Sequence, residues 1–214
     1  MKELIKGCFL EHPFFILLYD LSLAMEILKN YLQSIINDSS LHKEINEIAT
    51  TFKHYTLAKN SYFVAKESVC KYFCFIESGI LQHSISTEGE EKTTYLALKN
   101  SCTSSLKSFL QKSPSRKNIK ALSTCSLWII TLEDFKYLLK NNTAFYQFYF
   151  NLIERQIFLI DDYRIDLLTL SPEERYQKLL TNEPELLQKV PLHYLASFLG
   201  ISTRHMSRIR KNIK

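Results

Sequence analysis

The sequence lacks a hydrophobic run long enough to cross a membrane, and it lacks a recognisable secretion signal. Its longest apolar stretch, PFFILLYDLSLAM at 13–25, is shorter than the roughly 20 residues of a membrane span and contains Asp20. No small-residue cleavage site follows this stretch. We therefore expect no membrane partner, a cytoplasmic location, and an N-terminal extension helix over residues 1–25.

Clustered cysteines are also absent. The five cysteines are scattered at positions 8, 70, 74, 102 and 125. An iron–sulfur cluster needs four suitably placed cysteines, and a disulfide framework needs a secreted context. The sequence therefore predicts reduced thiols, with no metal and no cofactor bound by them.

Acidic residues are missing from the C-terminal end, between Leu186 and Lys214. This segment holds six basic residues: Lys189, Arg204, Arg208, Arg210, Lys211 and Lys214. The other 21 Lys and Arg residues are balanced by all 22 acidic residues, so the excess charge lies at this end. Such an asymmetry indicates a polyanionic partner, although a solvated basic helix end is the alternative.

What the sequence does contain begins with helical spacing over residues 26–49. Apolar residues recur there every three or four positions, which predicts one or two helices. Ser40 is the expected N-cap of the second of these helices. From about residue 52 the sequence changes to short runs rich in β-branched and aromatic residues.

Those short runs predict strands. KYFCFIESG (71–79) and ILQHSIST (80–87) have strand character, and TEGEE (87–91) is typical of a hairpin turn. NIKALSTCSLWIITL (118–132) adds at least two more strands. Several short strands without crossover helices predict a small antiparallel barrel or sandwich.

Glycine and proline are absent from residues 132–170, where the pattern becomes helical again. A helix from about Ala144 to Leu168 would be roughly 37 Å long at 1.5 Å per residue. Spacings of four and three alternate along a seam in which six of seven members are apolar: Tyr146, Phe150, Ile153, Ile157, Ile160, Arg164 and Leu167. We expect the six apolar members to pair with a second copy of the chain; packing within its own domain is the alternative.

A further helix begins at residue 171. Ser171 is the expected N-cap, Pro172 the first helical residue and Glu174 the partner of Ser171 in a capping box. Two more helices are predicted in PLHYLASFLG and STRHMSRIRKNIK. Gly200 lies between them and suits a left-handed turn.

The last two helices have the features of a helix-turn-helix. Ala196 is small enough for a close helix crossing, and Ser202 is the expected N-cap of the second helix. Met206 and Ile209 would face the first helix and leave a polar and basic face outward. The second helix of such a motif enters the major groove of DNA and reads base edges.

The order of these elements resembles the Crp/Fnr family of bacterial transcription regulators. The stretch 170–213 is similar to the DNA-binding end of members from the Bacteroidetes, and YFCFIESGIL (72–81) resembles the family's barrel strand ending in a hairpin glycine. The resemblance implies an α+β chain with N-terminal helices and a small antiparallel barrel of the jelly-roll, cyclic-nucleotide-binding type. It implies a sensor barrel over 26–143, a dimerisation helix over 144–169 and a DNA-binding helix-turn-helix domain over 170–214.

The resemblance also implies partners and site residues. The chain would bind double-stranded DNA as a homodimer, with RNA polymerase as a further possible partner. Thr203, Arg204 and Arg208 match the positions of base-reading side chains, and Arg208 suits a bidentate contact to guanine. Ser202 lies at a helix N-terminus and would hold a phosphate. The full predicted DNA-binding set is Ser202, Thr203, Arg204, His205, Ser207, Arg208 and Lys211.

The family's cyclic-nucleotide cassette is not matched. Cyclic-nucleotide binders of the family carry Gly-Glu and then Arg-Ser/Thr-Ala, but this chain has no glycine between Gly89 and Gly200 and no acid between Glu91 and Glu133. When the cassette is aligned on IKAL (119–122), its arginine position falls on Ser115 and its Ser/Thr position falls on Arg116. We therefore expect no cyclic nucleotide in the barrel, and Arg116 is the one candidate for holding an unknown effector.

Two other function classes stay open. A cupin-like enzyme would need about three histidines and a carboxylate inside the barrel, whereas this region has only His54 and His83. No local signature of serine or cysteine catalysis occurs either, so we predict no catalytic residues. A protein- or RNA-interaction module that uses the basic end is the second alternative.

Overall fold

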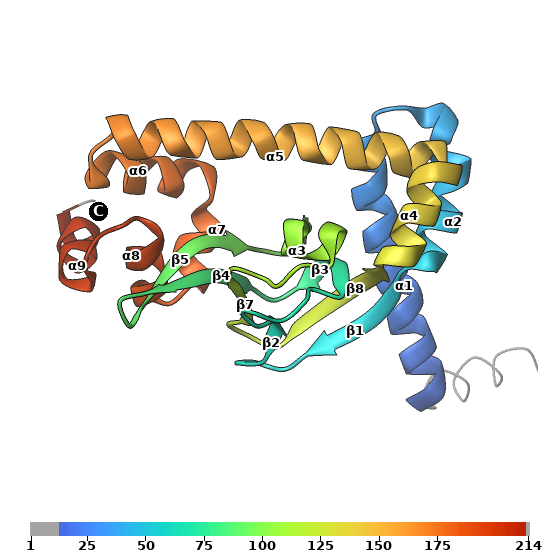
Figure 1. The fold of residues 1–214 in the computed structure, drawn as a ribbon, viewed down its shortest axis with the longest axis horizontal. Coiled ribbons are helices and arrows are strands. Elements are labelled where there is room, and N and C mark those ends of the chain that lie inside the picture. Colours follow the sequence, from blue (N-terminus) through green and yellow to red (C-terminus); the bar gives the residue numbers. More distant parts are fainter. Residues whose placement is uncertain (1–12, 213–214) are drawn as a thin grey trace, which may run out of the picture.

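A computed structural model describes residues 13–212, and its N-terminal part is helical (Figure 1). The elements are α1 (Pro13–Ile36), the 3-10 helix η1 (Ser39–Glu44) and α2 (Ile45–Thr51). The helices expected over 26–49 are confirmed, and α1 continues through residue 25; positions 1–12 of the expected extension lie outside the described residues. The expected cap at Ser40 is wrong: the Asp38 side chain accepts a hydrogen bond from the Ser40 backbone N–H at 2.9 Å.

The middle of the chain folds into two packed antiparallel sheets of four strands each. The strands are β1 (Lys53–Leu57), β2 (Tyr62–Val64), β3 (Tyr72–Ser78), β4 (Leu81–Thr87), β5 (Glu90–Ala97), β6 (Ser101–Thr103), β7 (Asn118–Ala121) and β8 (Cys125–Thr131). Their orders are β1-β8-β3-β6 and β2-β7-β4-β5. The strands expected at 71–79, 80–87 and within 118–132 are confirmed as β3, β4, β7 and β8. Of the barrel or sandwich expected, the structure has a two-sheet sandwich.

Two turns of the sandwich depend on glycine in different ways. Glu88 and Gly89, with φ of +54° and +81°, close the predicted hairpin between β4 and β5. Gly79, with φ of +99°, instead joins β3 to β4, which lie in different sheets. The expectation of a hairpin at Gly79 is therefore wrong, and this glycine marks a crossing between the sheets.

A long helix, α5 (Thr143–Thr169), spans the molecule and follows the short helix α4 (Leu132–Asn141) (Figure 1). Asn142 separates the two helices and caps α5, because its side-chain oxygen accepts a hydrogen bond from the Phe145 N–H at 2.8 Å. The first turns of α5 bury Phe145, Phe148 and Leu152 in the same core as the sandwich and the N-terminal helices. The helix predicted from about Ala144 to Leu168 is confirmed.

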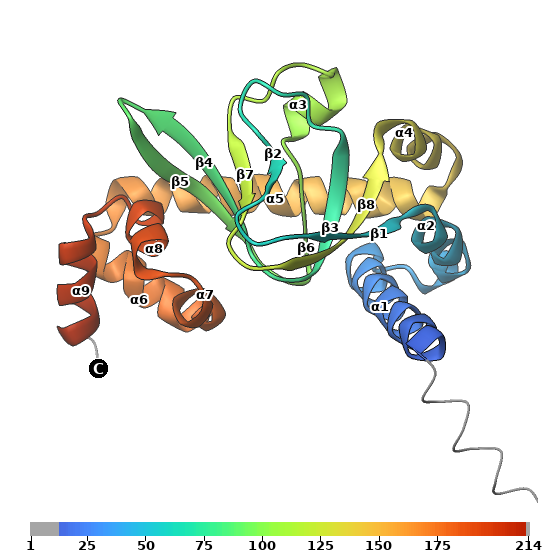
Figure 2. The same cartoon turned by 90° about the horizontal axis from the view of Figure 1, so that it is seen from below.

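Four short helices form the C-terminal end, which we call the C-terminal helices. They are α6 (Pro172–Asn182), α7 (Pro184–Lys189), α8 (Leu192–Phe198) and α9 (Thr203–Asn212). The capping box of Ser171 and Glu174 is present as predicted, with Pro172 in the first turn. These helices lie at one end of α5, beside the β4–β5 hairpin (Figure 2). None of the helices in residues 13–212 is long and apolar enough for a membrane span.

A small helix, α3 (Leu106–Gln111), interrupts the sandwich between β6 and β7. It starts directly after Ser104 and Ser105, and Phe109 anchors it in the core. The Phe109 ring lies beside Phe73 of β3, in the first sheet, with centroids 6.4 Å apart. Residues of α3 and of the turns around it line the cavity described below.

Candidate nucleic-acid interface and the adjoining cavity

The turn between α8 and α9 follows from a left-handed glycine. Gly200 has φ of +69°, and its N–H donates to the Ser197 carbonyl at 3.1 Å. The Ile201 N–H donates to the Ala196 carbonyl at 3.0 Å. These two bonds form the Schellman arrangement that ends a helix and redirects the chain. The turn predicted at Gly200 is confirmed.

Helix α9 has one buried and one exposed side. Met206 and Ile209 are buried, as expected from their spacing. The Ser202 hydroxyl caps the helix, accepting from the His205 N–H at 3.2 Å. On the other side, the predicted DNA-binding residues Ser202, Thr203, Arg204, Arg208 and Lys211 are exposed, and His205 and Ser207 are half-buried. The predicted set thus lies on one short helix and its cap.

One side chain of α9 has a partner that the sequence pattern did not indicate. His205 Nε2 lies 2.8 Å from Glu173 Oε1 on α6. The pKa of Glu173 lies below its ordinary value, because of the hydrogen bond from His205, then its own backbone N–H and the positive charges of His205 and Arg208. A carboxylate therefore sits at the edge of the basic face.

The predicted pairing seam of α5 is largely uncovered. Tyr146, Phe150, Ile157, Ile160 and Leu167 are between 47% and 64% exposed, and Ile153 is half-buried. Exposed side chains of this size in a row are unusual on a monomer. The first turns of α5 are packed into the core, whereas the later turns present an apolar stripe.

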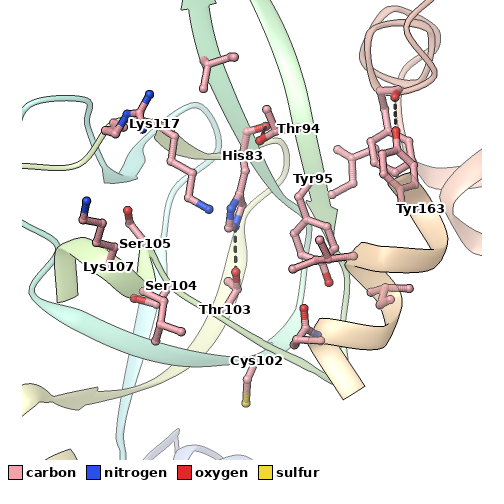
Figure 3. A pocket seen from close by; sticks show the side chains of 18 of the residues that line it. His83, Thr94, Tyr95, Cys102, Thr103, Ser104, Ser105, Lys107, Lys117 and Tyr163 are labelled. Carbon is pink, nitrogen blue, oxygen red and sulfur yellow. Dashed lines mark hydrogen bonds between the residues drawn. The ribbon is translucent and has the colours of Figure 1, made fainter. Parts of the chain in front are cut away.

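A cavity of about 1390 Å³ lies between the second sheet, α5 and the C-terminal helices. Figure 3 shows its polar end, where His83 of β4 points toward Thr103 at the end of β6, with Ser104 and Ser105 following on one side and Tyr95 of β5 on the other. Lys107, Arg116 and Lys117 make this end cationic. The opposite end is lined by apolar side chains of α5, α6 and α8, including Leu159, Leu179 and Phe198, together with charged side chains such as Asp162, Asp166 and Lys178. One end is therefore cationic, and the other mixes apolar groups with charges of both signs.

His83 is a buried polar group in this cavity. Its side chain is 2% exposed; Nε2 bonds to Thr103 Oγ1 at 2.8 Å, and Nδ1 has no partner. Burial, and secondarily the nearby Lys117, hold the pKa of His83 well below its ordinary value. Burial also lowers the pKa of Lys117. A buried ring nitrogen without a partner is free to bond a ligand.

Comparison with known proteins agrees with this architecture. Residues 55–142 match the family model of the cyclic nucleotide-binding domain. Similar folds occur in FixK2 from Bradyrhizobium japonicum (TM-score 0.65, 10% identity, 76% of this chain and 84% of that chain) and in a crp/fnr-family protein from Eubacterium rectale (0.60, 18%, 82% and 82%). CLP of Xanthomonas campestris, a c-di-GMP responsive global regulator, has a similar fold with a TM-score of 0.62 and 14% identity. The match covers 80% of this chain and 90% of that chain.

The chain has the Crp/Fnr fold around a cyclic nucleotide-binding domain. At 10–18% identity these likenesses show the fold and leave the ligand and the DNA sequence undefined. No curated protein matches the sequence.

Within the Crp/Fnr fold, the expected cassette arginine position has a structural role. Ser115 is buried, and its hydroxyl bonds to Ser105 Oγ at 2.9 Å and to the Lys117 carbonyl at 2.7 Å. Arg116 is exposed and lines the cavity, as a candidate effector residue should. The position that would carry the arginine thus holds a serine whose hydroxyl links Ser105 to the backbone at Lys117.

The sequence pattern missed most of the cavity's polar end. His83 and Tyr95 lie on neighbouring strands, and Tyr163 reaches the cavity from the far part of α5. Strand alternation could have placed His83 inward, but it could not have paired it with Thr103 or Lys117. Four cysteines, Cys70, Cys74, Cys102 and Cys125, are buried free thiols, and no group of three or more metal-binding side chains occurs within residues 13–212.

Proposed function

We propose that this chain is a cytoplasmic transcriptional regulator that binds double-stranded DNA as a homodimer and catalyses no reaction. The observation that carries the proposal is the two-sided character of helix α9. Met206 and Ile209 are buried on one side, while Arg204, Arg208 and Lys211 are exposed on the other. The Crp/Fnr fold and the concentration of excess positive charge at the C-terminal end support it.

The roles of the α9 side chains differ by position. Arg208 and Arg204 have long, exposed guanidinium groups that suit guanine in the major groove, and Thr203 precedes them at the helix start. Lys211 would contact phosphate, with Ser207 beside it, and Ser202 would present the helix N-terminus to phosphate. Within the described residues, Arg204, Arg208 and Lys211 form no ion pair, which leaves them free for DNA.

Fluorescence anisotropy with labelled duplexes at graded salt tests this function. The wild-type protein should bind duplex DNA with an affinity that falls steeply with salt. Arg208→Ala should lose about 10- to 100-fold for a duplex selected by the wild type from a random pool, corresponding to about 1–3 kcal/mol. Lys211→Ala should weaken every duplex alike and reduce the salt slope by about 0.9.

The control is Lys136→Ala, which removes an exposed lysine of α4 at the other end of α5. It should leave DNA affinity unchanged. Equal affinity for single-stranded RNA and every duplex, or no binding to any nucleic acid, would contradict the proposed function. The first result would favour the RNA-interaction alternative.

The homodimer is proposed from the exposed stripe of α5. Pairing of two stripes would cover Phe150, Ile157 and Leu167 and set two copies of α9 for a two-fold symmetric operator. Ile157→Glu should convert a dimer to a monomer in sedimentation experiments without loss of the monomer fold. Tyr137→Glu, at an equally exposed aromatic on α4, should stay dimeric. A wild-type monomer at micromolar concentration would contradict the pairing.

We also propose that the cavity holds a small effector that is not a cyclic nucleotide. The cationic end contains Lys107, Arg116 and Lys117, but the cassette's glycine, glutamate and arginine are absent. Calorimetric titration with cAMP and with cGMP should give no binding at micromolar concentration. Tight binding of either nucleotide that Arg116→Ala abolishes would overturn this part of the proposal.

A further inference from the structure

Glu173 is a carboxylate at the edge of the proposed DNA-reading face. A shallow groove beside α9 is lined by Glu173, His205, Arg208, Ile209 and Asn212. Glu173 Oε1 lies 2.8 Å from His205 Nε2, so the contact joins α6 to α9 across 32 residues of sequence. Of the side chains lining this groove, Glu173 alone is acidic.

The position of Glu173 is fixed by its own helix start. It follows Pro172, and the reciprocal bonds of Ser171 and Glu174 close the same turn. The Ser171 N–H donates to Glu174 Oε2 at 2.7 Å, and the Glu174 N–H donates to Ser171 Oγ at 3.3 Å. Because this backbone is held, the carboxylate stays beside α9 and does not depend on a mobile loop.

The charge of Glu173 acts on two proposed DNA-binding residues. It is ionised at neutral pH, since the hydrogen bond from His205 and the charge of Arg208 lower its pKa. Half of its side chain is solvent-exposed, so the pair adds little to fold stability. A DNA phosphate that approaches this edge would meet the negative charge of Glu173 near Arg208, and it would compete with Glu173 for His205.

We propose that Glu173 is a specificity-determining residue of DNA binding, which weakens non-specific phosphate contacts by engaging His205 and offsetting the charge of Arg208. Phosphate contacts are attractions between full charges and carry no sequence information. Base recognition uses hydrogen bonds to neutral base edges, which a nearby carboxylate penalises less. The inference rests on the proposed DNA-binding function.

The test compares two duplexes of about 30 base pairs, one of arbitrary sequence and one selected by the wild-type protein from a random pool. Glu173→Gln keeps a side-chain oxygen that can accept from His205 but removes the charge. If one phosphate contact is gained, the arbitrary duplex should bind about five-fold tighter near 0.15 M salt, with a salt slope steeper by about 0.9. The selected duplex should gain less, so discrimination between the two should fall.

Two further variants separate charge from other effects. Glu173→Asp keeps the charge and should retain wild-type discrimination, whereas behaviour like that of Glu173→Gln would overturn the charge account. Glu133→Gln removes the same charge from α4, at the other end of the molecule, and should change neither affinity (Figure 1). Urea unfolding of each variant checks that the fold is intact.

The outcomes distinguish the two proposals. If the wild type binds DNA with normal salt dependence and Glu173→Gln leaves both affinities unchanged or lowers them, the role of Glu173 is refuted and DNA binding stands. If the wild type binds no duplex, the proposed function itself fails and takes this inference with it.

Discussion

The sandwich and the C-terminal helices are built in opposite ways. The sandwich shares one continuous core with the N-terminal helices and the first turns of α5, and this core contains fully buried aromatic side chains such as Phe75, Phe109 and Phe135. The C-terminal helices have a cluster of twelve buried residues, three of which, Ile80, Leu96 and Leu122, come from the sandwich. The sandwich is therefore part of one large core that includes the N-terminal helices and α5, whereas the C-terminal helices have a small core that includes three sandwich residues.

Two further contacts place α8 between β5 and α5. The Thr93 N–H of β5 donates to Ser197 Oγ at 2.9 Å. The Tyr163 hydroxyl of α5 donates to the Phe198 carbonyl at 2.6 Å, and the two rings stack with centroids 5.1 Å apart. A change in the cavity that moved β5 or α5 would therefore be felt directly at α8 and its turn into α9.

The largest effect should come from Gly79 in the sandwich. A Cβ there would lie 2.6 Å from Cys125 Sγ and 2.8 Å from both the Cys125 Cα and the Thr124 carbonyl, at a φ of +99° that side chains rarely adopt. Gly79→Ala should therefore cost more than about 3 kcal/mol in free energy of unfolding, through overpacking and backbone strain together. Urea denaturation or a failure to express folded protein would show it; a loss below 1 kcal/mol would contradict this packing.

The next effect is a pH dependence of the sandwich that originates at His83. Because burial depresses its pKa in the folded state, the unfolded chain takes up a proton as pH falls below about 6.5 while the folded protein does not. Stability should therefore be lost from about pH 6.5 downward until the folded-state pKa is reached, at up to about 1.4 kcal/mol per pH unit.

Denaturation at pH 7.5 and at pH 5.5 measures this dependence, with His83→Gln as the comparison. The variant retains a group that can bond to Thr103, but it lacks the titrating ring. Its loss of stability between the two pH values should be smaller than that of the wild type. Equal losses would show that His83 is not the group responsible.

The sequence predicted local features well where one residue determines one geometry. The capping box at Ser171, the left-handed turn at Gly200 and the buried pair Met206 and Ile209 depend on nearby residues only. Contacts between distant segments could not be predicted, because hydrophobic spacing indicates which face of an element is buried but not which other element packs against that face. The contact of His205 with Glu173 and the Thr103–His83 bond are of this kind.

The errors have the same origin. Gly79 was expected in a hairpin because of the resemblance of residues 72–81 to a family strand, but the sheet that β4 joins is set by its pairing with β5 and β7. Ser40 suited an N-cap, but Asp38 is the N-cap: its side chain accepts from the Ser40 N–H, so the 3-10 helix begins before Ser40. In both cases the residue type suited the predicted role, but the structure depends on a contact with another residue or strand that the prediction did not include.

A smaller effect is expected at the junction of the two regions. Ser197→Ala removes the acceptor for the Thr93 N–H, and Thr93 is buried, so this donor would lose its partner. The expected cost is about 1–2 kcal/mol, because water reaches the half-buried Ser197 side. Hydrogen exchange should show faster exchange at the Thr93 amide and in α8, with the core strands β3 and β8 unchanged. Uniform acceleration throughout the chain would contradict a local junction.

The smallest effect should come from Gly200, the counterpart of Gly79 in the C-terminal helices. A Cβ at Gly200 would meet no atom within 4 Å, so only the left-handed backbone, with φ of +69°, opposes a side chain. Gly200→Ala should therefore cost about 1 kcal/mol, and Gly200→Asn less, because asparagine tolerates this conformation better. Urea denaturation of both variants beside Gly79→Ala measures the contrast. Equal losses at Gly79 and Gly200 would mean that backbone strain, and not crowding against Cys125, dominates at both sites, and the contrast between these two glycines would fail.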